Sequence, residues 1–162
     1  MLFSRGDLLA DLHGLVLGAL FPLAYSGGLA GLIGLRTEWK TERGLRVQMR
    51  RLKIGTVAMA VIAWLTVLVG TYLVYPLYQA QYRPVLSETF WNTFAMAWKI
   101  HLGWIAPLLA TAVAYVVNRY DAQLAREVRI RQALEVVFTA AFLAAAVTGL
   151  LGALTTKVLP VE

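Results

Sequence analysis

Apolar residues in this chain come in four long blocks that are separated by short polar segments. The blocks cover about residues 8–35, 54–78, 93–117 and 133–156. Each is longer than about 20 residues, the length that an α-helix needs to cross the hydrocarbon core of a bilayer. The pattern therefore predicts an all-α integral membrane protein, a four-helix bundle with up-down-up-down order in which residues 1–162 form a single transmembrane domain.

Two of the polar segments between the blocks are strongly basic. Residues 36–53 carry seven basic and two acidic residues, and residues 119–131 carry four basic and two acidic residues. Basic loops stay on the cytoplasmic side of a membrane. Both segments therefore predict that the two termini lie on the outer, periplasmic side of a membrane, which we expect to be a bacterial plasma membrane. The net charge of +6 is explained by these two basic segments, which membrane topology requires. We therefore expect no nucleic-acid partner.

Composition agrees with the membrane class and excludes several chemistries. The chain is 59% hydrophobic and 15% charged, whereas a soluble domain averages about 25% charged residues. It contains no cysteine, which excludes disulfides, iron–sulfur clusters and covalent c-type haem attachment. There is no nucleotide-binding loop, nucleophile motif or metal-hydrolase motif. We therefore do not expect an enzyme that works alone.

The chain has two histidines, and both lie inside apolar blocks. His13 is about five residues into the first predicted helix, and His101 is about eight residues into the third. These helices enter from the same side, so at about 1.5 Å per residue the two side chains differ in depth by only a few ångströms. An ionisable side chain at this depth is costly and is by default a candidate for function.

The first and third helices of an up-down-up-down bundle are diagonal partners, with axes roughly 13 Å apart. Two imidazoles need about this gap to hold a metalloporphyrin between them, so His13 and His101 are candidate axial ligands of one b-type haem. The residues expected around such a ring are glycines near the histidines and tryptophans one helical turn from His101: Gly14, Gly18, Gly103, Trp98 and Trp104.

Three alternatives remain open at this point. A chlorophyll-type tetrapyrrole takes a single histidine. Zinc is less well suited, because it needs three or four protein ligands and only Asp7, Asp11 and Glu88 are near enough to help. In the third alternative there is no cofactor: the histidines hydrogen-bond to neighbouring helices, the glycines serve packing and the tryptophans anchor the membrane interface.

Glycine and proline positions predict how the helices approach one another and bend. Gly14-x-x-x-Gly18 and Gly27-x-x-x-Gly31 have a spacing that lets another helix come close. Pro22 is expected to bend the first helix near Gly18.

The region around His101 carries two further features. Pro107 removes the hydrogen bond to the carbonyl group of Gly103. Lys99 is two residues before His101, on roughly the opposite face, and we expect it to snorkel to the outer surface in preference to reaching a haem propionate.

The segments His13-Gly14-x-x-x-Gly18 and His101-x-Gly103 resemble those of four-helix membrane b-type cytochromes, which include the haem-bearing anchors of respiratory dehydrogenases. The resemblance covers the four-helix plan and these few positions. It implies an electron-transfer subunit with one haem b, held by His13 and His101, in a larger respiratory or photosynthetic complex. The implied partners are other membrane subunits, lipid and a quinone. The alternative functions are a cofactor-free accessory subunit and a chlorophyll-binding subunit.

Overall fold

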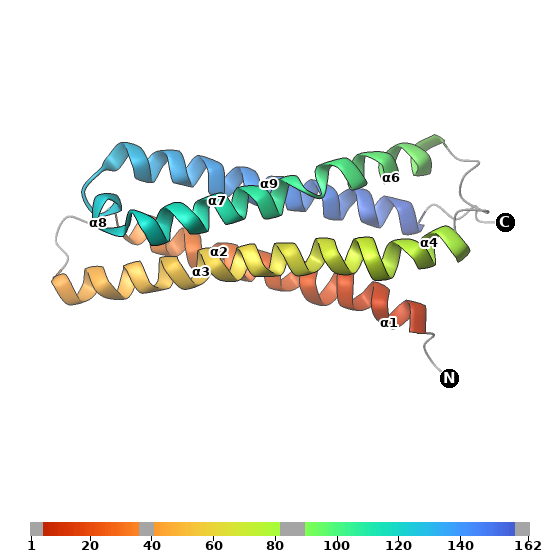
Figure 1. The fold of residues 1–162 in the computed structure, drawn as a ribbon, viewed down its shortest axis with the longest axis horizontal. Helices are drawn as coiled ribbons and strands as arrows, with labels where there is room; N and C mark the ends of the chain where they lie inside the picture. Colours follow the sequence, from red (N-terminus) through yellow and green to blue (C-terminus); the bar gives the residue numbers. More distant parts are fainter. Residues whose placement is uncertain (1–4, 36–40, 82–89, 158–162) are drawn as a thin grey trace.

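The computed structural model describes residues 5–35, 41–81 and 90–157 as an elongated bundle of four helical spans (Figure 1). The first span consists of α1 (Arg5–Asp11), the π-helix η1 (Leu12–Leu17) and α2 (Gly18–Gly34). The second consists of α3 (Glu42–Val69), the π-helix η2 (Gly70–Val74) and α4 (Tyr75–Gln81). The third consists of α6 (Phe90–Leu102) and α7 (Ile105–Arg119). A short helix, α8 (Asp121–Leu124), leads to the fourth span, α9 (Val128–Lys157).

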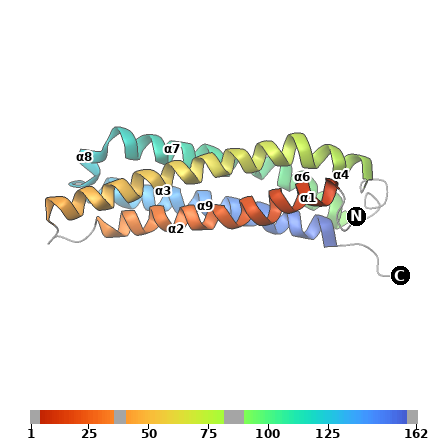
Figure 2. The same cartoon turned by 90° about the horizontal axis from the view of Figure 1, so that it is seen from below.

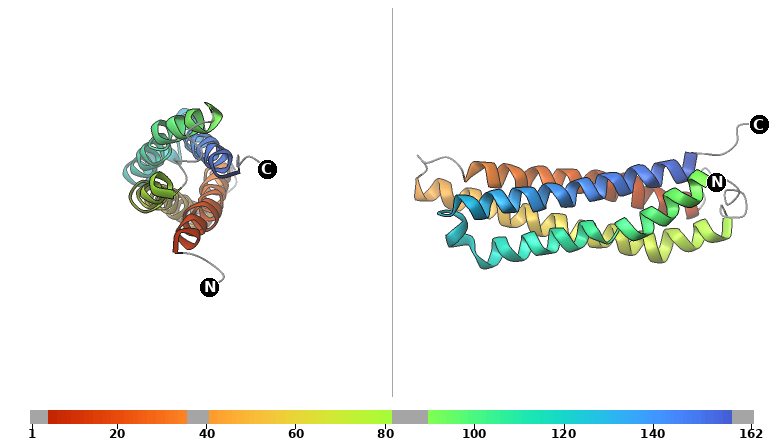
Figure 3. Two further views of the ribbon diagram at one scale, coloured as in Figure 1. Left: turned by 90° about the vertical axis from the view of Figure 1, so that its right-hand side faces the viewer. Right: turned by 90° about the horizontal axis from the view of Figure 1, so that it is seen from above.

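The spans run up, down, up and down around the bundle axis. Helix α2 packs against α3, α3 against α7, and α9 against α7, α6 and α2. The first and third spans are therefore diagonal, as the end-on view of Figure 3 shows. Helix α1 and the last turn of α9 lie at one end of the bundle, here called the terminal end, and α8 lies at the other, the loop end (Figure 2). The predicted four-helix architecture is confirmed.

Four helical segments are long and apolar enough to cross a membrane, which is consistent with an integral membrane protein. They are Leu8–Gly34, Glu42–Ala80, Phe90–Arg119 and Val128–Thr155. The second and fourth begin earlier than their apolar blocks. Part of the basic segment expected to be a loop is in fact the first turns of α3.

Thr41 begins α3. Its backbone is extended, and its Oγ1 accepts a hydrogen bond of 3.2 Å from the amide of Gly44. This is the usual way in which threonine satisfies a free amide at a helix start. The apolar block marks only the part of this helix that lipid surrounds, because arginine, lysine and glutamine are themselves good helix formers.

Three prolines disturb three of the four spans in the terminal half of the bundle. A proline cannot donate a hydrogen bond to the residue four positions earlier, and its ring crowds that carbonyl group. Pro22 follows η1, Pro76 follows η2, and Pro107 follows the break between α6 and α7. The bend expected at Gly18 thus takes the form of a π-helix that ends at Leu17. Helix α9 contains no proline and is continuous over its described length.

The apolar core lies between α2, α3, α7 and α9. Its largest fully buried side chains include Leu32, Leu52, Met59, Val113 and Phe138. These residues lie mainly in the loop-end half, where the helices are regular. The loop-end half therefore contains most of the packed core, whereas the terminal half contains the irregular helical turns.

Only some of the glycines allow the close helix contacts that their spacing predicted. A Cβ on Gly31 would lie 2.8 Å from the backbone of Leu52, so α2 and α3 do approach closely there. A Cβ on Gly14, Gly18 or Gly27 would meet nothing within 4 Å. The Gly14-x-x-x-Gly18 prediction is wrong for contacts within this chain, because these glycines face away from the neighbouring helices.

Candidate functional site

His101 lies on the outward face of α6 and is exposed. Its Nδ1 atom is 2.6 Å from the backbone carbonyl oxygen of Ala97, one turn earlier. A carbonyl oxygen can only accept, so Nδ1 carries the proton and the lone pair of the neutral ring is on Nε2. This is the arrangement in which metal-binding histidines are usually held. The structure thus presents an oriented coordinating nitrogen on the outer surface of the bundle.

Aromatic side chains line the same face of α6. Trp98 is 48% exposed and shares the outward side with His101, as expected from its spacing. Trp104 lies beyond the end of α6, and its ring packs edge-on against Trp64 of α3, with the ring centroids 6.0 Å apart. The rings of Phe90, Phe94 and Trp98 follow one another at centroid distances of 5.9 Å. His101 therefore continues an exposed aromatic row along α6.

His13 lies in η1, and its ring points toward the second span. A Cβ on Gly70, the first residue of η2, would come within 2.6 Å of the His13 Cε1 atom, so the ring occupies the space that this glycine leaves. The His13 Nδ1 atom is buried and has no hydrogen-bond partner among the residues that the structure describes. His13 is thus an interior side chain with one unsatisfied nitrogen.

The structure does not bring His13 and His101 together. His13 faces the second span inside the bundle, whereas His101 faces outward from the third. The two rings are therefore not arranged to hold one metalloporphyrin within a single chain. The cause is the packing of α6 against α9, which turns the small and polar face of α6 inward and its aromatic face outward.

The expected glycines do not enclose a ring beside the histidines either. Gly14 and Gly18 are exposed on the surface of the first span. A Cβ on Gly103 would lie 2.9 Å from the carbonyl oxygen of Lys99. Gly103 therefore serves the tight break between α6 and α7.

Lys99 turns into the bundle, contrary to the expected snorkelling to the outer surface. A Cβ on Gly152 of α9 would lie only 2.9 Å from the Lys99 Nζ atom, so the ammonium group occupies the space over this glycine. Lys99 is also close enough to His13 for its charge to act on that ring. Lys99, and not His101, is thus the side chain that the third span turns toward the fourth, over Gly152.

A polar network extends from this region toward the terminal end. The Tyr78 hydroxyl donates a hydrogen bond of 2.5 Å to Oδ1 of the buried Asn92. Asn92 Nδ2 donates to the carbonyl oxygen of Thr155 at 2.9 Å, and Thr155 Oγ1 donates to the carbonyl oxygen of Gly152 at 2.7 Å. The third span thus contributes a polar interior stripe from Asn92 to Lys99.

Sequence reasoning missed this interior stripe, although a signal for it is present. Asn92, Ala95, Lys99 and Gly103 recur at spacings of three and four residues, which places them on one helix face. The bulky aromatic residues Phe90, Phe94 and Trp98 lie on a different face of the same helix. The small and polar stripe therefore marks the side that packs against another helix, as is usual in membrane proteins.

No group of three or more metal-ligating residues exists within the described ranges. The zinc alternative would need Asp7 and Glu88, whose side chains lie outside the part of the chain that the structure describes.

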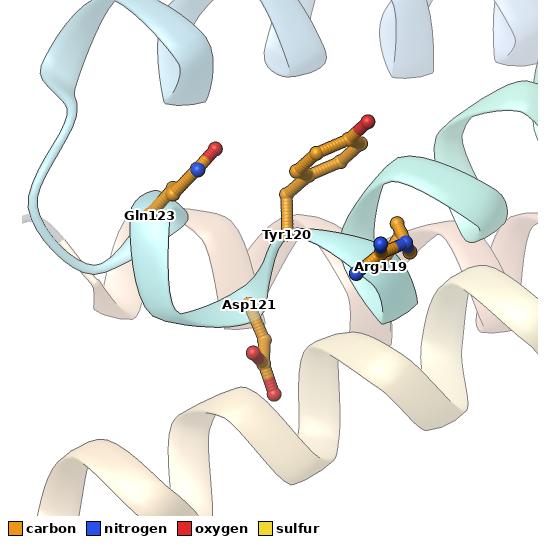
Figure 4. A pocket seen from close by; sticks show the side chains of 4 residues that line it. All are labelled: Arg119, Tyr120, Asp121 and Gln123. Carbon is orange, nitrogen blue, oxygen red and sulfur yellow. The ribbon is translucent and has the colours of Figure 1, made fainter.

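A shallow pocket lies at the loop end, far from both histidines. Arg119, Tyr120, Asp121 and Gln123 line it (Figure 4). Asp121 points toward α3, where Lys53 Nζ lies 2.7 Å from its Oδ2 atom. The main charged group of the pocket is thus already engaged in joining two helices, so we regard the terminal half as the better candidate site.

No family of known proteins, curated protein sequence or solved structure matches this chain. Its function must therefore be argued from its own residues.

Proposed function

We propose that this chain is a membrane electron-transfer subunit in which His101 supplies one axial ligand to a metallotetrapyrrole, b-type haem in the first instance. The observation that carries the proposal is the 2.6 Å contact between His101 Nδ1 and the Ala97 carbonyl oxygen. It fixes the tautomer, holds the ring against the helix and leaves Nε2 available on an exposed surface. Nothing in a packing role requires this nitrogen to face outward.

The neighbouring side chains suit a flat apolar macrocycle. Trp98 lies one turn before His101, and Phe94 continues the aromatic row. Aromatic rings pack favourably against extended π systems. The bound group would supply one-electron chemistry, while the chain supplies the ligand, the apolar surroundings and the position.

Each chain offers one ligand to this group, because His13 faces the interior. Haem iron with two axial ligands would need its second ligand from a partner subunit or another copy of this chain. A chlorophyll-type tetrapyrrole needs only His101. In either case we propose that the chain belongs to a larger respiratory or photosynthetic complex, with other membrane subunits and lipid as its neighbours.

The proposed membrane orientation follows from charge. Segments 36–53 and 119–131 hold most of the basic residues, so we propose that the loop end is cytoplasmic and the terminal end is on the outer side. His101 would then lie near the outer face, where its cofactor could exchange electrons with an outer-side partner.

The test is spectroscopic and compares two histidine variants. The complex is purified in mild detergent, and a reduced-minus-oxidised spectrum and a pyridine haemochrome assay are recorded; extraction into acetone distinguishes chlorophyll-type pigment. We expect one tetrapyrrole per chain, lost in His101→Ala and retained in the matched control His13→Ala. A colourless complex, or pigment that survives in His101→Ala, would refute the proposal. Loss in His13→Ala alone would also contradict it.

One observation favours a second candidate, a cofactor-free accessory subunit. Gly14, Gly18, Gly27 and Gly149 have open space where a side chain would be. These positions would let helices of partner subunits approach closely from outside. A colourless native complex whose assembly fails in Gly14→Leu and Gly18→Leu would support this function over the tetrapyrrole.

A further inference from the structure

One exposed face of α7 is apolar and ends in an arginine. It consists of positions that recur at spacings of four, three and four residues, which places them on one side of the helix: Leu108, Ala112, Tyr115 and Arg119. All four are exposed, Leu108 by 57% and Tyr115 by 63%. Arg119 is the last residue of α7 and of the third candidate membrane span. The apolar face therefore leads directly to a cation at the membrane boundary.

The pocket of Figure 4 adjoins this cation. It has a volume of about 260 Å³ and is lined by Arg119, Tyr120, Asp121 and Gln123. Pockets that enclose a whole small molecule usually measure roughly 300–1,000 Å³. This space is smaller, so it suits a polar headgroup whose apolar chains lie outside the pocket.

The lining side chains are mainly hydrogen-bond donors. The Arg119 guanidinium, the Tyr120 hydroxyl and the Gln123 amide can all donate. Tyr120 and Gln123 extend to the same side of the chain, whereas Asp121 points the other way, toward α3 (Figure 4). The Arg119 Cζ atom lies 5.7 Å from the centre of the Tyr120 ring, so the cation stays beside the pocket. A cation together with neutral donors is the usual setting for a phosphate group.

The charges at the pocket leave Arg119 uncompensated. The Asp121 carboxylate is already paired, because its Oδ2 atom lies 2.7 Å from Lys53 Nζ. The ion pairs among the described residues join Lys53 to Asp121 and Arg46 to Glu42, and neither includes Arg119. The dipole of α7 favours a cation at this end but supplies only about half a unit of charge. A ligand with one net negative charge would therefore balance the site.

The backbone around the pocket is held in place by neighbouring helices. Lys53 of α3 fixes the first residue of α8 through Asp121. The buried Arg131 of α9 fixes the end of α8, because its Nη1 atom donates to the carbonyl oxygens of Leu124 at 2.8 Å and Ala125 at 3.1 Å. The pocket is thus already formed, and a ligand would not have to order the chain in order to bind.

We propose that the pocket and the apolar face of α7 together bind one phospholipid whose headgroup carries a single net negative charge. Arg119 pairs with the phosphate, Tyr120 and Gln123 donate hydrogen bonds to the headgroup, and an acyl chain lies along the apolar face. A zwitterionic headgroup adds an ammonium group, which Arg119 and Lys53 repel, so such lipids bind more weakly. Basic pockets at the ends of membrane helices commonly recognise anionic lipid in this way. The site is at the opposite end of the bundle from His101 and does not require the tetrapyrrole.

The first test counts lipid molecules on the full chain by native mass spectrometry. Detergent-purified chain is titrated with dioleoyl phosphatidylglycerol and, separately, with dioleoyl phosphatidylcholine. We expect one phosphatidylglycerol molecule to bind about fivefold more tightly than phosphatidylcholine, or more. Arg119→Gln should abolish this preference, and Arg119→Lys, which keeps the charge, should retain part of it.

The matched control for this test is Arg129→Gln, which removes an exposed arginine at the same end of the bundle but outside the pocket lining. It should leave the preference unchanged. Equal binding of the two lipids to the unaltered chain would overturn the proposal. An equal loss in Arg119→Gln and Arg129→Gln would also overturn it, because the attraction would then come from the basic end as a whole.

A second measurement separates the lipid from a soluble anion and from a change in the fold. Inorganic phosphate and glycerol 3-phosphate lack acyl chains, so we expect neither, in large excess, to displace phosphatidylglycerol. Displacement by either would overturn the proposal in favour of a soluble anion. Without lipid, Arg119→Gln should unfold at the same temperature as the unaltered chain, since the Arg119 side chain is exposed. Phosphatidylglycerol should raise the unfolding temperature of the unaltered chain only. An equal rise in both would exclude Arg119 from the site.

Discussion

Gly28 of α2 and Gly55 of α3 lie against each other with almost no space between their backbones. A Cβ on Gly55 would come within 2.4 Å of the Gly28 nitrogen and 2.7 Å of its Cα atom. On its other side Gly28 is just as crowded, because a Cβ there would lie 2.5 Å from Cζ of the buried Phe138. These two glycines fix how closely the first two spans approach and how the ring of α9 packs onto them.

Adding one methyl group at either glycine should therefore destabilise the bundle. We expect Gly55→Ala to lower the free energy of unfolding by about 1–3 kcal/mol, the usual cost of overpacking a tight core. The change is measured by unfolding in mixed detergent. Gly27→Ala is the matched control, since a Cβ at Gly27 meets nothing within 4 Å. Equal stability of the two variants would show that α2 and α3 are farther apart than described.

Asn92 joins two spans to the third, and its loss should be measurable. It accepts from Tyr78 and donates to the Thr155 carbonyl group. We expect Asn92→Ala to lower the free energy of unfolding by about 1–2 kcal/mol, the range found for interhelical hydrogen bonds in membranes. In the control Asn118→Ala the lost bond runs only to Ala114 in the same helix. A change no larger than in this control would argue against the interhelical network.

Pro76 should be the cause of the π-helix η2. Pro76→Ala restores an amide that can donate to the carbonyl group of Tyr72, so we expect residues 70–76 to adopt regular helix. Amide hydrogen exchange over this segment should slow, because fewer carbonyl and amide groups lack partners. The position of Gly70 against His13 should change as well. An unchanged exchange pattern would show that side-chain packing, and not the proline, maintains the π-helix.

The proposed orientation can be checked by labelling. Cysteine introduced at Gly44, near the start of α3, should react with an impermeant thiol reagent only from the cytoplasmic side. Cysteine at Ala80, an exposed position at the terminal end of α4, should react only from the outer side. The chain has no native cysteine, so each variant carries a single thiol. The reverse pattern would invert the topology.

The four helices and their order could be predicted because each depends on a property of the sequence itself. The lengths of the apolar blocks predict the spans, and the positions of Pro22 and Pro107 predict two of the three local disturbances. The direction of Lys99 could not be read in this way. Whether a membrane lysine snorkels or turns inward depends on which residue faces it, and here it faces Gly152, which is 53 residues away in the sequence.

The same limit applies to the two histidines. Their shared depth follows from helix length, but the face that each presents follows from packing. Helix α6 turns Asn92, Ala95 and Lys99 toward α9 because small and polar side chains allow the closest approach. His101 is left on the outside as a result. Depth was therefore predictable from one helix at a time, whereas mutual orientation required the whole bundle.

The unequal distribution of prolines has a mechanical consequence. Helix α9 is continuous through the described length of the bundle, whereas each of the other three spans contains a π-helix or a helix break in the terminal half. A change in the angle between α6 and α7 at Gly103 and Trp104 would leave the loop-end core in place. We therefore expect any movement that accompanies binding at His101 to be confined to the terminal half of the bundle.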